Sequence, residues 1–175
     1  MPLNDPAYFV DLLDNILSIG CECLADTTLG APQDCFVSHC APADDCCDFF
    51  AVWLDQVYPT RTFPETYDGS TRECTEFLPA ARIGMRVMRP CVPTVVDNAT
   101  NPFPPAAELD TSAKDLLIDA RVLWCCYVQA HANDLLFPEG FDCLEVSWGI
   151  MEPECPRGGC AGWTWFLTLE TDQCC

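Results

Sequence analysis

The chain has 175 residues, of which 50% are hydrophobic and 20% are charged. This composition excludes an intrinsically disordered protein and indicates one globular domain, residues 1–175, that is large enough to bury a core. The formal net charge is −19, and the first 60 residues contain ten acids and no base. A surface with this charge disfavours binding to nucleic-acid phosphates or to anionic lipid.

The sequence shows neither a targeting signal nor a membrane span. A signal peptide starts with basic residues and continues with an apolar run, whereas this chain has Asp11 and Asp14 in its first apolar stretch. The longest apolar run, residues 116–128, contains Asp119 and Arg121 and is too short to cross a bilayer. We therefore expect a soluble protein without a Sec signal, whose cysteines stay mostly reduced.

A helix is expected over residues 5–19. Asp5 suits the N-cap, Pro6 suits the first helical position and Gly20 is a natural stop. Apolar side chains recur at helical spacing, at Phe9, Leu12, Leu13, Ile16 and Leu17. Residues 21–45 are expected to form a cysteine-rich loop, because prolines, a glycine and several aspartates interrupt them.

Two strands are expected within residues 46–89. The first, residues 46–58, is rich in aromatic and β-branched side chains, which is typical of a buried strand. In the second, about residues 77–89, apolar side chains alternate with Arg82, Gly84, Arg86 and Met88, which predicts one apolar and one basic face. The basic face either is solvated or contacts an acidic surface of another subunit.

The second half repeats this layout. Residues 90–107 contain five prolines and are expected to form an irregular connector. A helix over 108–131 follows, with an apolar stripe that Leu117, Trp124 and Val128 widen into a face suited to packing on a sheet. Two alternating strands then occupy residues 143–170. The order helix–strand–strand–helix–strand–strand predicts an α+β fold with a mainly antiparallel sheet and helices packed on one face.

The 15 cysteines allow three interpretations. Buried free thiols acting as small hydrophobic side chains are favoured, also for Cys125 and Cys126 beside the helical stripe. Disulfides are the second, and Cys174 and Cys175 could join chains. A structural zinc site is the third, with possible ligands Cys21, Cys23, Cys35, His39, Cys40, Cys46 and Cys47. The spacing departs from paired Cys-x-x-Cys knuckles, so we assign no metal ligand.

No residue is assigned a catalytic or cofactor-binding role. A nucleophilic cysteine needs a nearby base, and the only histidines are His39 and His131. His39 neighbours Cys40, but side chains adjacent in sequence diverge, and His131 is expected at the surface near the end of the second helix. The sequence contains no phosphate-binding glycine loop and no His-Glu-x-x-His motif. We therefore expect a structural protein and not an enzyme.

Several short motifs occur in order between residues 46 and 170. They are Cys46-Cys47, Tyr58-Pro59, Phe63-Pro64, Met88-Arg89-Pro90-Cys91, Trp148-Gly149 and the run from Gly158 to Trp163. In this order they resemble the neck proteins of tailed bacteriophages that infect actinobacteria, most closely the tail terminator or head-to-tail connector proteins. The N-terminal cysteine cluster and the Cys174-Cys175 end fall outside the pattern.

The resemblance implies a ring, usually a homohexamer, at the head-proximal end of the tail, which caps tail-tube polymerisation and joins tail to head. Its expected partners are further copies, the tail tube protein and the head-to-tail stopper or adaptor. Genomic DNA would pass an acidic lumen without specific binding, and no membrane is involved. The expected location is the virion neck, after assembly in the host cytoplasm. Residues 90–107 and the hairpin over 151–160 would reach adjacent rings.

Three alternatives remain open from the sequence. The nearest is a head-to-tail adaptor or stopper ring between portal and tail, which the number of copies in the ring would distinguish. A secreted disulfide-rich binding module would have paired cysteines. A small zinc-dependent or thiol enzyme would have a bound metal, or a reactive thiol near His39.

Overall fold

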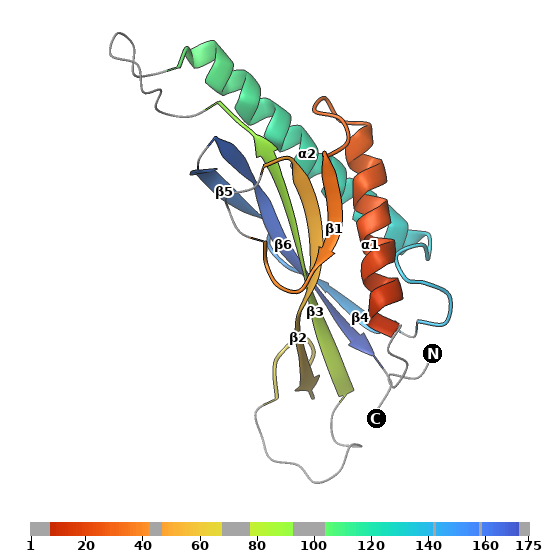
Figure 1. Ribbon diagram of the computed structural model, residues 1–175. Helices are drawn as coiled ribbons and strands as arrows, with labels where there is room; N and C mark the ends of the chain where they lie inside the picture. The colour runs from red at the N-terminus through yellow and green to blue at the C-terminus, as the bar shows by residue number, and fades with distance from the viewer. Residues whose placement is uncertain are drawn as a thin grey trace.

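The computed structural model describes residues 8–42, 47–67, 78–92, 104–141, 143–157 and 159–171. These residues form an α+β domain in which one mixed sheet of six strands packs against two helices (Figure 1). In chain order the elements are α1 (Tyr8–Ala25), β1 (Asp34–Ser38), β2 (Phe49–Thr60), β3 (Leu78–Pro90), α2 (Ala106–Ala132), β4 (Cys143–Trp148), β5 (Glu152–Arg157) and β6 (Cys160–Thr171). Neither helix is long and apolar enough to cross a membrane.

The sheet has two strands that the sequence patterns did not predict. Its strand order is β1-β2-β3-β6-β4, with β5 paired to β6. β1 lies parallel to β2, while every other pairing is antiparallel. β1 was missed because it is short and exposed and lacks an alternating pattern. β5 was missed because it contains Pro153 and Pro156, which a sheet tolerates only at its edge.

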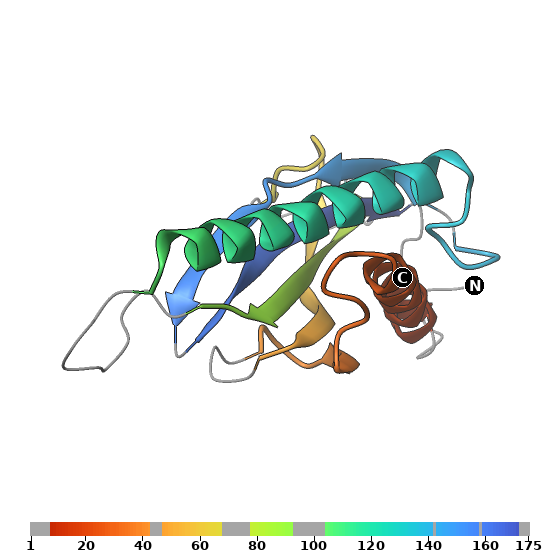
Figure 2. The same cartoon turned by 90° about the horizontal axis from the view of Figure 1, so that it is seen from above.

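The helices cover one face of the sheet, as predicted. Apolar side chains of that face alternate along the strands and meet both helices in one core. Its fully buried members include Leu12, Ile16, Phe50, Ile83, Met85, Leu123, Trp165 and Leu167. In Figure 2, α2 extends across the strands and α1 is seen end-on beside it.

The first helix is longer than predicted, because Gly20 does not stop it. α1 continues to Ala25, and Gly20 lies where the helix packs tightly against Phe50 and Tyr127. A Cβ atom at Gly20 would lie 2.3 Å from the Phe50 ring and 2.5 Å from the Tyr127 hydroxyl. The glycine therefore permits close packing, and the Tyr127 hydroxyl donates a hydrogen bond of 2.6 Å to the carbonyl oxygen of Ile16.

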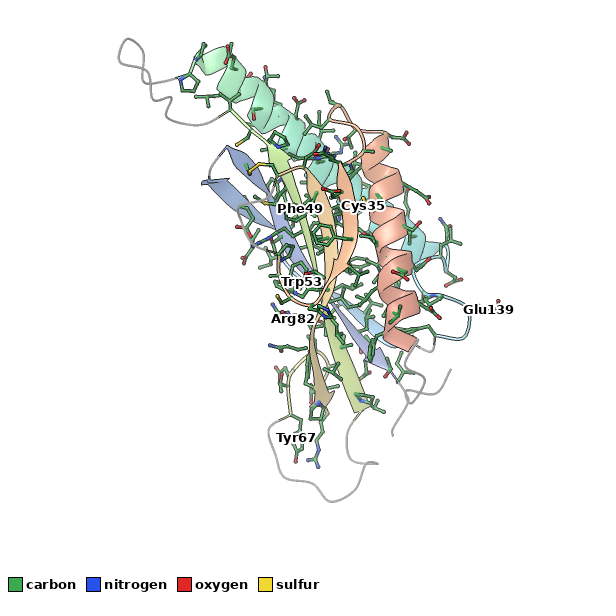
Figure 3. All side chains as sticks on the ribbon, viewed as in Figure 1. Cys35, Phe49, Trp53, Tyr67, Arg82 and Glu139 are labelled. Atoms are coloured by element: carbon green, nitrogen blue, oxygen red, sulfur yellow. A yellow bond between two sulfur atoms is a disulfide. The ribbon has the colours of Figure 1, made fainter. Side chains whose placement is uncertain are left out.

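The opposite face of the sheet carries the predicted basic row, but part of it is buried. The guanidinium of Arg86 donates to the carbonyl oxygen of Pro42 at 2.6 Å and to Glu154 Oε1 at 2.8 Å. The segment after β1 thus crosses this face and covers Arg86. The guanidinium of Arg86 therefore already has partners within its own chain, and the expected contact of this basic face with a neighbouring subunit stays a prediction. Figure 3 shows Phe49, Trp53 and Arg82 in succession along the sheet.

Two segments, the connector over residues 90–107 and the hairpin over 151–160, were expected to reach other rings. Most of the connector, residues 93–103, lies outside the described residues. The hairpin over 151–160 is not a free arm, because Glu152–Arg157 forms β5 and pairs with β6.

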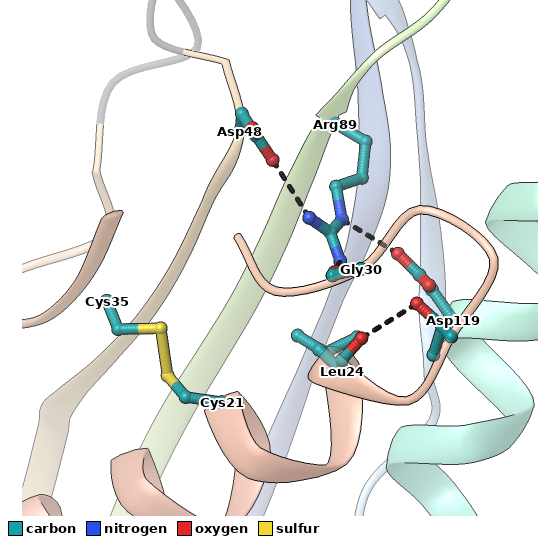
Figure 4. A network of polar contacts seen from close by, with 8 residues as sticks. Cys21, Leu24, Gly30, Cys35, Asp48, Arg89 and Asp119 are labelled. Carbon is teal, nitrogen blue, oxygen red and sulfur yellow. Dashed lines mark hydrogen bonds and ion pairs between the residues drawn. A yellow bond between two sulfur atoms is a disulfide. The ribbon is translucent and has the colours of Figure 1, made fainter. Parts of the chain in front are cut away.

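A buried arginine, Arg89, joins four segments of the fold (Figure 4). Its side chain is 1% exposed and lies at the end of β3. The guanidinium donates to Asp119 on α2 at 2.8 Å, to Asp48 before β2 at 2.8 Å and to the carbonyl oxygen of Gly30 at 2.6 Å. Asp119 is fully buried as well. Removing Arg89 would leave Asp119 in the interior without a counter-ion, and removing Asp119 would leave Arg89 with only the partly exposed Asp48 as its counter-ion.

We expect Asp119→Ala to lower the free energy of unfolding by about 3–5 kcal/mol, because the Arg89 cation would lose its buried counter-ion. Lys114→Ala is the matched control. It removes another ion pair of the same helix, to Asp110, in which both side chains are more than 60% exposed, and it should change little. Urea unfolding followed by tryptophan fluorescence measures both. Equal losses in the two variants would contradict a central role for Arg89.

Candidate functional site

The structure distributes the cysteines of the zinc interpretation among different bonds. Cys21 is bonded to Cys35, Cys23 to Cys126 and Cys47 to Cys160. Within the described ranges, no group of three or more His, Cys, Asp or Glu side chains is arranged to hold a metal ion. His39 and Cys40 are exposed, and Cys46 lies outside the described residues.

The favoured prediction of free thiols is wrong for six of the cysteines. The three disulfides join α1 to β1, α1 to α2, and the segment just before β2 to β6. Their sequence separations are 14, 103 and 113 residues. Spacing could not identify the two long-range pairs, because only the tertiary fold brings their partners together. Cys125 is free, yet it is exposed and not a buried hydrophobic side chain.

The last turn of α2 contains His131, as predicted. The side chain is exposed, and its ring lies 6.0 Å from the ring centroids of Phe137 and Trp148. The imidazole of His131 thus packs against aromatic rings. None of its described contacts is with a thiol or hydroxyl that it could activate as a nucleophile.

A groove of about 430 Å³ lies on the sheet face opposite the helices. Tyr58, Arg82, Ile150 and Phe166 contribute to its walls. The Arg82 guanidinium lies 3.8 Å from the centroid of the Phe166 ring, and its Nε is 3.4 Å from Asp55. Burial raises the pKa of Tyr58, although a hydrogen bond with Thr168 and the charge of Arg82 act in the opposite direction. Arg82, the one basic side chain that lines the groove, is therefore already in contact with Phe166 and Asp55.

The outer surface of α2 is a stronger candidate for an interaction site. Leu117 is 57% exposed, Trp124 40% and Val128 39%, and Arg121 is exposed between them. We call Leu117, Arg121, Trp124 and Val128 the α2 patch. The Trp124 ring lies 5.8 Å from that of Trp148 on β4, which holds the indole in place at the surface.

The prediction that this face packs on the sheet is wrong for Leu117 and Val128, while Trp124 is partly covered by Trp148 of β4. The buried side chains of α2 are those of Asp119, Ala120, Leu123, Tyr127 and Ala130. Successive side chains of a helix point in directions about 100° apart. The sheet and α1 contact α2 from one side, so they cover only the narrow stripe that these buried side chains form. Arg121, in the row between Leu117 and Trp124, is the signal in the sequence that this row faces solvent.

Comparisons with known proteins do not identify the chain. No family model matches it, and no curated protein matches it in sequence. The resemblance to phage neck proteins therefore stays a prediction.

Replacing Cys23 and Cys126 together by serine should lower the free energy of unfolding by about 2–4 kcal/mol, because the bond closes a long loop in the unfolded chain. Cys125→Ser is the matched control, since Cys125 precedes Cys126 but is free and exposed. Urea unfolding without reductant measures both. A double variant as stable as the wild type would mean that this bond does not form in solution.

Cys143 should be alkylated slowly at neutral pH. Burial is the main reason that the pKa of its thiol is raised from 9.0 to about 11, and only the thiolate reacts. Its rate with iodoacetamide, followed by mass spectrometry of its peptide, should keep rising until about pH 11. In the unfolded chain the Cys143 thiol loses its proton near pH 9. Because the folded state favours the protonated thiol, this thiol contributes to folding stability below pH 9, and the contribution is lost as the pH rises to about 11. A rate that levels off near pH 9 would contradict this burial.

Proposed function

We propose that the protein is a structural protein that acts by self-assembly, as the ring that caps tail-tube polymerisation and joins tail to head in a phage. The observation that carries self-assembly is the α2 patch, which leaves Trp124 40% exposed and Leu117 57% exposed. Tryptophan and arginine are enriched at the centres of protein interfaces, and the grouping of exposed apolar side chains on one helix face supports such a role for this patch. The assignment to the phage tail comes from the motif order alone.

The charge of the chain fits this proposal. A net charge of −19 per copy would give a ring a strongly negative lumen. DNA is retained on proteins through phosphate contacts to lysine and arginine, so an acidic wall would let a genome pass without binding. The proposal assigns the chain no catalytic step, and it places the assembled protein in the virion neck. An adaptor or stopper ring would use the same properties with a different number of copies.

The disulfides favour a second candidate of another class, a secreted binding module. Three disulfides among the described cysteines are typical of proteins that function in an oxidising environment. In that case the α2 patch would bind a different protein, and the module would work as a monomer. A virion protein also meets an oxidising environment once the particle leaves its host, so the cysteines alone do not separate the two candidates.

Native mass spectrometry, with and without reductant and with added tail tubes, separates these functions. A sixfold ring, formed alone or on tail tubes, is the expected result for the terminator. A twelvefold ring would favour the adaptor. A monomer with intact disulfides that ignores tail tubes would exclude both rings and favour the secreted module.

A further inference from the structure

The chain has only eight basic residues against 27 acids, so most contacts between two copies would be repulsive. An attractive contact needs a base that is not already bound within its own copy. Arg86 is paired with Glu154, and Arg89 is paired with Asp48 and with the buried Asp119. Arg82 is paired with Asp55, and Lys114 is paired with Asp110.

Arg121 differs from these bases. It is exposed on α2, and within the described part of the chain it has no hydrogen bond, ion pair or ring contact. Leu117 lies one turn before it and Trp124 one turn after it, so the cation sits between two exposed apolar side chains on one helix face. The α2 patch therefore offers an unpaired positive charge in an apolar setting, and its complement is an acidic surface.

The outer surface of α1 has the matching charge. Asp11, Asp14, Ser18 and Glu22 are exposed at helical spacing, and we call them the α1 acidic row. α1 contains no base, and Asp11 and Asp14 have no partner among the described residues. Val10 is 53% exposed at one end of the row. Asp11 to Glu22 and Leu117 to Val128 span the same number of residues, about 16 Å of helix each.

We propose that the α2 patch of one copy docks against the α1 acidic row of a second copy, with Arg121 facing the carboxylates. This inference rests on the proposed function of self-assembly and names its contact. The two surfaces lie on different helices, so the contact is heterologous, and each copy keeps one free surface of each kind. Contacts of this type close into rings when the rotation between copies permits. The attraction between exposed charges should weaken as salt rises.

Reciprocal charge reversal tests the proposal, with self-association measured by sedimentation velocity at low salt. R121E, D14R and E22R should each weaken association, R121E by about tenfold or more. Combining R121E with D14R or with E22R should restore much of the loss, because the two charges are exchanged. R61E is the matched control: it makes the same charge change at an exposed arginine just after β2, which stacks on Tyr67 and belongs to neither surface, and it should leave association intact. Far-ultraviolet circular dichroism checks that each variant is folded.

The outcomes distinguish this contact from the proposed function. If the wild type associates but R121E does so equally well, the contact is wrong while self-assembly stands. If R121E weakens association and neither combination restores any of it, the α1 acidic row is not the occupant and the proposal is overturned. If the wild type remains a monomer at all concentrations and with tail tubes, the proposed function fails together with this contact.

Discussion

The guanidinium of Arg89 is the interaction on which the arrangement of the domain depends. It lies at the end of β3 and binds Asp119 on α2, Asp48 before β2 and the turn after α1. The helices, the central strands and the first loop therefore meet at one buried cation. Burying a charge is unfavourable unless its partners are in place, so the pairing of this cation favours the observed placement of these segments.

The core and the disulfides stabilise the same arrangement at different places. Apolar side chains of both helices and of β2, β3 and β6 form the core, and Gly20 lets α1 approach Phe50 and Tyr127. The bond between Cys23 and Cys126 joins the two helices, and that between Cys47 and Cys160 joins the segment just before β2 to β6. The chain is large enough to fold around its core, so the bonds add stability to a fold that packing already defines.

Charge shapes the surface in an unusual way. Most of the bases that the structure describes are bound within the chain, while the α1 acidic row and many other acids face solvent. Net charge of this size keeps copies apart, so specific association needs a local exception. The α2 patch is such an exception, because Arg121 lies among exposed apolar side chains there.

Sequence periodicity alone determined the two helices, four of the strands and the face of the sheet that the helices cover. Apolar side chains at helical spacing mark a helix, and alternating ones such as Ile83, Met85 and Val87 mark the buried face of a strand. It did not determine β1 and β5, because strands at the edge of a sheet need no alternation of apolar and polar side chains. It also did not determine the end of α1, because Gly20 allows close packing against Phe50 and Tyr127 and does not stop the helix. The pairing of Cys23 with Cys126 and the internal ion pairs of Arg86 and Arg89 depend on segments far apart in the sequence. Only the tertiary structure decided which row of α2 is covered, because a helix with a wide apolar face can bury only the part that its neighbours reach.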